Sequence, residues 1–125
     1  MMRQFYSFKW MLANGKRTLD EDIADLGGME IAWQAYQNRL QADGYTGAEL
    51  KLMKQRFFQA YAEEFRSKYN GEYVDIFVTG FFAVNHSMNK ERVNGVVANM
   101  DGWYDAFDIK EGALYRKPAD RVHIW

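Results

Sequence analysis

The pattern of apolar and polar residues predicts a first long amphipathic helix. Apolar side chains recur at i, i+4, i+7 and i+11 as Met29, Trp33, Tyr36 and Leu40. That spacing places them on one helical face, which a globular protein buries. We expect the helix to begin at Thr18, because Thr18 and Glu21 have the spacing of a capping box. The turn signal Asp43-Gly44 ends it.

A second helix follows with the same organisation. Thr46 and Glu49 again have capping-box spacing. One side of the predicted helix carries Leu50, Met53, Phe57, Tyr61 and Phe65. We expect it to run to about Tyr69, where Asn70-Gly71 forms a stop signal.

The rest of the chain gives weaker structural signals. Residues 5–12 fit a strand and a helix equally well, and residues 72–82 could form a strand or a buried helix. We favour a helix for 72–82 because its surroundings are helical. Residues 85–95 predict a loop and then the start of a helix, and residues 99–101 cap a short helix that ends near Phe107. An irregular segment follows, and we expect its final aromatic residue, Trp125, to be buried. The sequence predicts one mainly α domain over residues 1–125.

Composition narrows the function classes. The formal net charge is −1 and aromatic residues make up 17% of the chain, which suggests neither a nucleic-acid surface nor an anionic membrane surface as partner. There are no cysteines and only two histidines, His86 and His123, so a metal site would have to use His, Asp or Glu. We find no signal peptide and no apolar run of about 18 residues. We therefore expect a soluble chain whose compartment stays open.

The acidic stretch TLDEDIADLGG, residues 18–28, is unusual for a helix. Glu21 and Asp25 are four residues apart and share one helical face. In a purely structural interpretation, Glu21 is a capping residue and its acidic neighbours are partners of the helix dipole. Gly27-Gly28 is harder to explain, because two glycines in a helix cost about 2 kcal/mol relative to alanines. Glycines at such positions commonly allow another backbone to approach closely.

Several segments resemble one protein family, in order along nearly the whole chain. The segment GKRTLDEDIADLGG is similar to the "NGxxTLGENIADxGG" segment of the neprilysin/endothelin-converting-enzyme family of zinc endopeptidases. Further similarities lie in RFFQAYAEEFRSKY, HSMNKERVNG, ANMDGWYDAFDIKEG and the final RVHIW. The resemblance implies a compact multi-helix C-terminal lobe of a thermolysin-like zinc peptidase catalytic domain. The absence of cysteine points to the bacterial branch of the family.

The resemblance also implies roles for four residues. Glu21 matches the third zinc ligand, and Asp25 matches an aspartate that supports a zinc-binding histidine. His86 matches a histidine that hydrogen-bonds the oxyanion of the tetrahedral intermediate. Arg92 matches an arginine that binds a substrate carbonyl and contacts the aspartate. Without the resemblance, His86 would read as a surface or capping histidine and Arg92 as a solvated charge.

The chain also departs from the family pattern. Asp20 and Asp22 flank Glu21 where Gly and Asn are common, and Met88 and Val84 replace a usual Pro and Asp near His86. The H-E-x-x-H motif, which supplies two zinc ligands and the general base, is absent from the 125 residues. We therefore expect a C-terminal part of a peptidase that cleaves peptide substrates only when joined to the part bearing that motif. Alone, it should neither retain zinc nor act.

A different class of function stays open. The chain could be a helical association module that has lost catalysis, or one that pairs with a separate chain bearing H-E-x-x-H. The aromatic content favours association, including self-association, because apolar stripes without neighbours drive assembly. A Ca²⁺ or Mg²⁺ site in the acidic stretch is disfavoured, since such sites usually take oxygens from a looped backbone.

Overall fold

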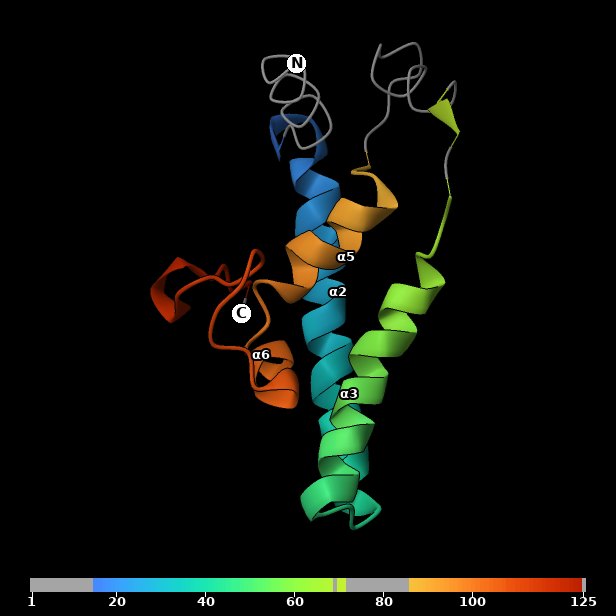
Figure 1. Cartoon of the computed structure of the whole chain (residues 1–125), viewed down its shortest axis with the longest axis vertical. Coiled ribbons are helices and arrows are strands. Elements are labelled where there is room, and N and C mark those ends of the chain that lie inside the picture. The colour runs from blue at the N-terminus through green and yellow to red at the C-terminus, as the bar shows by residue number, and fades with distance from the viewer. Residues whose placement is uncertain (1–14, 69, 72–85, 125) are drawn as a thin grey trace.

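The computed structural model describes residues 15–68, 70–71 and 86–124. The described elements are α2 (Gly15–Ala42), α3 (Gly47–Glu64), α5 (Asn89–Val97), α6 (Asp101–Phe107) and the 3₁₀ helix η1 (Pro118–Asp120). The expected mainly α fold is confirmed (Figure 1). The predictions for residues 5–12, for residues 72–82 and for Trp125 lie outside the described residues.

The two long helices form an antiparallel hairpin (Figure 1). α2 runs without a break through Gly27 and Gly28 for 28 residues. Gly44 ends the hairpin turn with a φ of 79°, a left-handed conformation that glycine adopts without steric cost. The turn is closed by the amide of Tyr45, which donates to the carbonyl of Leu40 at 3.1 Å. The stop signal at residues 43–44 is therefore confirmed.

The predicted helix starts are partly wrong. α2 begins at Gly15 and not at Thr18, and the Thr18 hydroxyl donates to Oδ2 of Asp22 at 2.7 Å. Thr18 thus lies inside the helix and does not form the expected cap. Thr46 occupies the N-cap position of α3, but its side chain makes no capping hydrogen bond. α3 ends at Glu64, about five residues before the expected end.

The core forms where the apolar faces of α2 and α3 meet. The Trp33 ring lies 5.1 Å from that of Phe57 and 4.8 Å from that of Phe58, between centroids. The stripe predicted for α2 is confirmed, since Met29, Trp33 and Leu40 are buried and Tyr36 packs against the core. On α3 the stripe was incomplete, because its buried residue is Phe58, which lies one position beyond the predicted Phe57.

The shorter helices close over this hairpin. α5 packs against α2, and α6 packs against α3. The Tyr104 hydroxyl of α6 donates to the carbonyl of Ala98 at 2.7 Å, and Arg121 lies over the Tyr104 ring at 3.6 Å. The amide of Val122 donates to Oδ1 of Asn99 at 2.9 Å. These contacts hold the irregular segment after α6 against the turn between α5 and α6.

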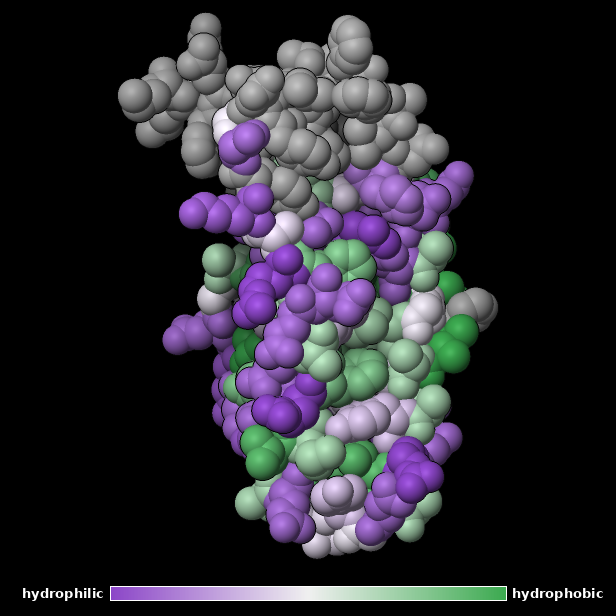
Figure 2. Space-filling view, turned by 90° about the vertical axis from the view of Figure 1, so that its right-hand side faces the viewer, coloured by the Kyte–Doolittle hydropathy of each residue, from purple (hydrophilic) through white to green (hydrophobic). Residues whose placement is uncertain are grey.

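The surface mixes hydrophobic and hydrophilic residues. On the face shown in Figure 2, hydrophobic side chains lie between hydrophilic ones over the described helices. Leu19, Ile23 and Ile31 of α2 are exposed. Among the described residues, no helix combines the length and apolar character needed to cross a membrane.

Candidate functional site

The four side chains predicted from the sequence to form the site come together between α2 and the start of α5. Glu21 and Asp25 project from successive turns of α2, and Arg92 projects from α5. His86 lies in the segment that leads into α5. Glu21 Oε2 is 3.3 Å from His86 Nδ1, and Asp25 binds Arg92. Residues 67 positions apart in the sequence thus share one face of the molecule.

Asp25 and Arg92 form a two-pronged ion pair. Nε of Arg92 donates to Oδ2 of Asp25 at 2.7 Å, and Nη2 of Arg92 donates to Oδ1 of the same carboxylate at 2.7 Å. Only 21% of the Arg92 side chain and 15% of the Asp25 side chain are exposed. The hydrogen bonding that Arg92 donates to Asp25 is the main reason that the pKa of Arg92 is raised. Charge-assisted, two-pronged pairs of this kind fix the orientation of a guanidinium group.

Two aromatic residues support Arg92, Tyr61 of α3 and Phe65 at the C-cap of that helix. The Phe65 ring lies 4.7 Å from the guanidinium carbon, within range of a cation–π interaction. The Tyr61 hydroxyl donates to the main-chain carbonyl of Arg92 at 3.1 Å. Burial, helped by the negative charge of Asp25, raises the pKa of Tyr61 to about 12. Tyr61 therefore remains a neutral donor at physiological pH.

The Glu21–His86 contact is much more open to solvent. Exposed fractions are 41% for the Glu21 side chain and 49% for the His86 side chain. Exposed ion pairs contribute little to stability, typically about 0–1 kcal/mol. With Nδ1 directed at Glu21, Nε2 is the imidazole nitrogen left for an external partner. The pair thus places a carboxylate and a nitrogen donor side by side at the surface.

A buried polar contact lies directly beside this open pair. Ser87 Oγ donates to Oδ1 of Asp22 at 2.9 Å, and the Thr18 hydroxyl donates to Oδ2 of the same carboxylate. Thr18 and Ser87 are both buried. From the sequence, Asp22 was expected only as a partner of the helix dipole and as a departure from the family pattern beside Glu21. The available signal was adjacency, since Asp22 follows Glu21 and Ser87 follows His86.

The described residues do not form a complete zinc site by themselves. Zinc sites in proteins use three or four His, Cys, Asp or Glu ligands. Within residues 15–68, 70–71 and 86–124 there is no group of three such side chains that could hold a metal ion. Glu21 is a half-exposed carboxylate beside an imidazole, and carboxylates are among the side chains that bind zinc in proteins.

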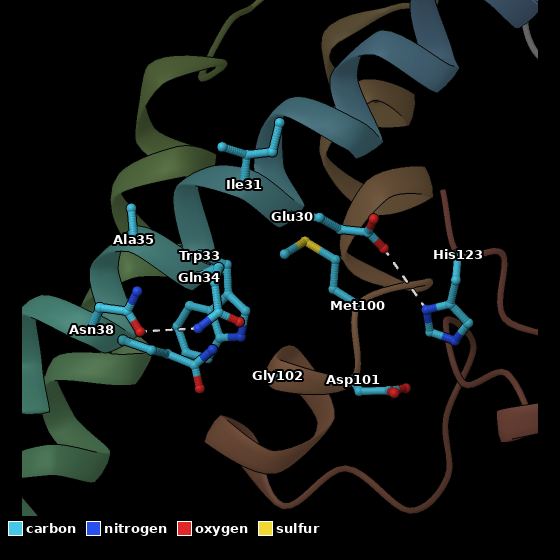
Figure 3. A pocket seen from close by; sticks show the side chains of 11 residues that line it. Glu30, Ile31, Trp33, Gln34, Ala35, Asn38, Met100, Asp101, Gly102 and His123 are labelled. Atoms are coloured by element: carbon cyan, nitrogen blue, oxygen red, sulfur yellow. Dashed lines mark hydrogen bonds and ion pairs between the residues drawn. The ribbon is translucent and has the colours of Figure 1, made fainter. Parts of the chain in front are cut away.

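A separate cavity of about 680 Å³ lies farther along α2 (Figure 3). Trp33, Met100 and Gly102 line it together with polar groups. Glu30 Oε1 and His123 Nδ1 lie 3.8 Å apart at its edge. This cavity contains none of the four predicted site residues.

Comparison with known proteins finds similarity to one peptidase family. The profile of peptidase family M13 matches residues 1–122. Mouse neprilysin is 33% identical over 134 residues, a match that covers 100% of this chain and 17% of neprilysin. The neutral endopeptidase of Lactococcus lactis subsp. cremoris is 34% identical over 114 residues, or 90% of this chain and 16% of the endopeptidase. No solved structure matches the chain significantly.

Proposed function

The chain belongs to peptidase family M13, and we propose that it supplies part of the active site of a neprilysin-like zinc metalloendopeptidase. The chain spans only 17% of the length of mouse neprilysin, so peptide-bond hydrolysis is proposed for the complete enzyme. The proposal rests on one observation above all. Glu21, Asp25, His86 and Arg92, which the family resemblance selects, converge in two adjoining pairs.

We assign Glu21 as the third zinc ligand. The two other ligands of such a site would be the histidines of an H-E-x-x-H motif, which the two histidines of this chain do not form. Bound zinc would polarise the scissile carbonyl and lower the pKa of a bound water. The 41% exposure of the Glu21 side chain supports this role, because a ligand for an incoming ion must be reachable.

His86 and Arg92 would act on the substrate. In this proposal His86 donates a hydrogen bond to the oxyanion that forms during peptide hydrolysis, where one positioned donor typically contributes about 100- to 1000-fold in rate. Arg92 has five N–H donors, and Asp25 accepts two of them. The remaining donors can bind a substrate carbonyl while Asp25 keeps the guanidinium oriented. Asp25 would in addition support a zinc-binding histidine.

A chimeric enzyme tests this proposal. The matching segment of the Lactococcus lactis neutral endopeptidase is replaced by this chain, and cleavage of a quenched fluorescent peptide is measured together with zinc content. We expect chelator-sensitive cleavage by the chimera and none by the 125-residue chain alone. Glu21→Gln should remove both zinc and activity. Glu30→Gln, which changes another α2 glutamate beside a histidine, should retain both.

Two results would refute the proposal. One is a folded, zinc-loaded chimera that does not cleave the peptide. The other is a Glu21→Gln chimera that retains the zinc content of its parent.

A second candidate function, a helical association module, is favoured by the exposed side of α2. Leu19, Ile23 and Ile31 are four and eight residues apart and are exposed by 53%, 42% and 60%. They are exposed apolar side chains of one helix, and a Cβ added at Gly28 of the same helix would meet no described atom within 4 Å. A chain bearing H-E-x-x-H or a second copy could cover such side chains. Sedimentation of the isolated chain is the test, and a clean monomer would argue against self-association.

A further inference from the structure

We propose that Asp22 is a positioning residue that holds His86 in place through Ser87, an inference that rests on the proposed function of His86. Both oxygens of the Asp22 carboxylate accept hydrogen bonds. Oδ1 accepts from Ser87 at 2.9 Å and Oδ2 accepts from Thr18 at 2.7 Å. Asp22 thus ties the residue that follows His86 to the body of α2.

The contact joins two pairs of neighbours in the sequence. Glu21 and Asp22 are consecutive on α2, and they meet the consecutive residues His86 and Ser87. The Glu21–His86 contact is half exposed and 3.3 Å long, so it restrains the imidazole weakly. The Asp22–Ser87 contact is shorter, and Ser87 is buried. Hydrogen bonds to an ionised carboxylate are roughly twice as strong as neutral ones, so this partly buried link fixes the backbone from which His86 extends.

The carboxylate suits this position because it accepts from two hydroxyls at once. The Thr18 hydroxyl lies 3.2 Å from that of Ser87, and each hydroxyl has a single hydrogen to donate. Thr18 donates its hydrogen to Asp22, and the Ser87 hydrogen can reach both Asp22, at the shorter distance, and the Thr18 oxygen. An alanine at position 22 would leave both hydroxyls without this acceptor. An asparagine would still accept from Ser87 through its carbonyl oxygen and could donate its amide hydrogen to Thr18.

The first test uses the 125-residue chain and needs no enzymatic activity. Nuclear Overhauser contacts between the His86 ring and the Glu21 side chain are measured by NMR, together with heteronuclear relaxation of the His86 and Ser87 amides. Asp22→Ala and Ser87→Ala should weaken the ring contact at least twofold and increase amide motion, whereas Asp22→Asn should preserve most of both signals. Asp20→Ala removes an exposed carboxylate from the same turn and should leave them unchanged. Circular dichroism melting verifies that each variant is folded.

The second test uses the Lactococcus lactis chimera. Asp22→Ala should lower kcat about 10-fold, less than the 100- to 1000-fold loss expected when an oxyanion donor is removed entirely. KM and zinc content should stay within twofold of the parent, and Asp22→Asn should restore at least half of kcat. A merely structural role would lower zinc content and kcat together in the alanine variant.

The outcomes separate this inference from the proposed function. If the parent chimera is inactive while loaded with zinc, the proposed function fails and the NMR arm alone decides whether Asp22 positions His86. If Asp22→Ala leaves the His86–Glu21 contact and the amide motion unchanged, the inference is wrong even in an active chimera. A parallel loss of zinc and kcat would also overturn it, because Asp22 would then act on Glu21.

Discussion

The Asp25–Arg92 pair links α2 to α5 in the candidate site, and its coupling free energy can be measured. The perturbation is a double-mutant cycle with Asp25→Ala, Arg92→Ala and both together. Exposed pairs contribute about 0–1 kcal/mol, whereas breaking a buried pair by removing one partner costs about 3–5 kcal/mol. With 15% and 21% of the side chains exposed, this pair lies nearer the buried case.

The geometry of the pair narrows the expected loss in the free energy of unfolding. The pair has two hydrogen bonds of 2.7 Å, and hydrogen bonds to charged groups contribute roughly 1.5–3 kcal/mol. We expect each single substitution to lower the free energy of unfolding by about 2–3 kcal/mol. Arg92→Ala also removes the guanidinium from the Phe65 ring, which places it at the upper end. The coupling free energy should be about 1–3 kcal/mol.

Urea unfolding of the 125-residue chain, followed by tryptophan fluorescence, supplies the four free energies. The Arg39–Asp43 pair at the C-terminal end of α2 is a matched control, because it is exposed, four residues apart and held by one hydrogen bond of 2.8 Å. Its cycle should give a much smaller coupling, because solvent screens an exposed pair. If the two cycles return equal couplings, the argument that burial and two-pronged geometry strengthen the Asp25–Arg92 pair is refuted.

Three further predictions concern single positions. Gly102→Ala should lower the free energy of unfolding by about 1–3 kcal/mol, because a Cβ there would lie 2.4 Å from the Trp33 ring; an unchanged urea midpoint would contradict the close packing. Gly28→Ala should stabilise the isolated chain by about 0.5–1 kcal/mol, since the added Cβ meets open space, yet impair zinc binding or folding of the chimera if α2 packs closely there against the H-E-x-x-H helix; unchanged chimera activity would remove that argument. The pKa of Tyr61 is raised from 10.0 to about 12, so its contribution to stability is complete below pH 10 and is lost as the pH rises toward 12. Tyr61→Phe should flatten that part of the stability profile, and a profile identical to the parent's would refute the assignment.

The apolar spacing predicted the helices better than their boundaries. The stripe from Met29 to Leu40 is governed by helical periodicity, and the structure buries it as expected. The cap predicted at Thr18 depends instead on which partner its hydroxyl finds. The Thr18 hydroxyl contacts Asp22, one turn along the helix, and Ser87, 69 residues away. A capping box is defined by four consecutive residues. The spacing of Thr18 and Glu21 therefore could not reveal that Asp22 and Ser87 compete for the Thr18 hydroxyl.

The candidate site was reached through family resemblance and not through spacing. Periodicity placed Glu21 and Asp25 on one face, but only the resemblance connected them to His86 and Arg92. The supporting contacts from Tyr61 and Ser87 were missed because each depends on tertiary packing between elements far apart in the sequence. The roles of the four residues remain predictions that the chimera and its variants test.

The length of α2 sets a gradient of amide protection along the molecule. At about 1.5 Å per residue its 28 residues span about 42 Å, with Trp33 and Leu40 seated in the core and Glu21 and Asp25 nearer the other end. Beyond the core, the described links that hold this end include Asp25–Arg92 and Asp22–Ser87. Hydrogen exchange should therefore be slowest around Trp33 and quicken toward Gly15. The N-terminal end of α2 would then unfold before the end that packs in the core. On heating, the contacts of the candidate site should be lost while most of the helix remains folded.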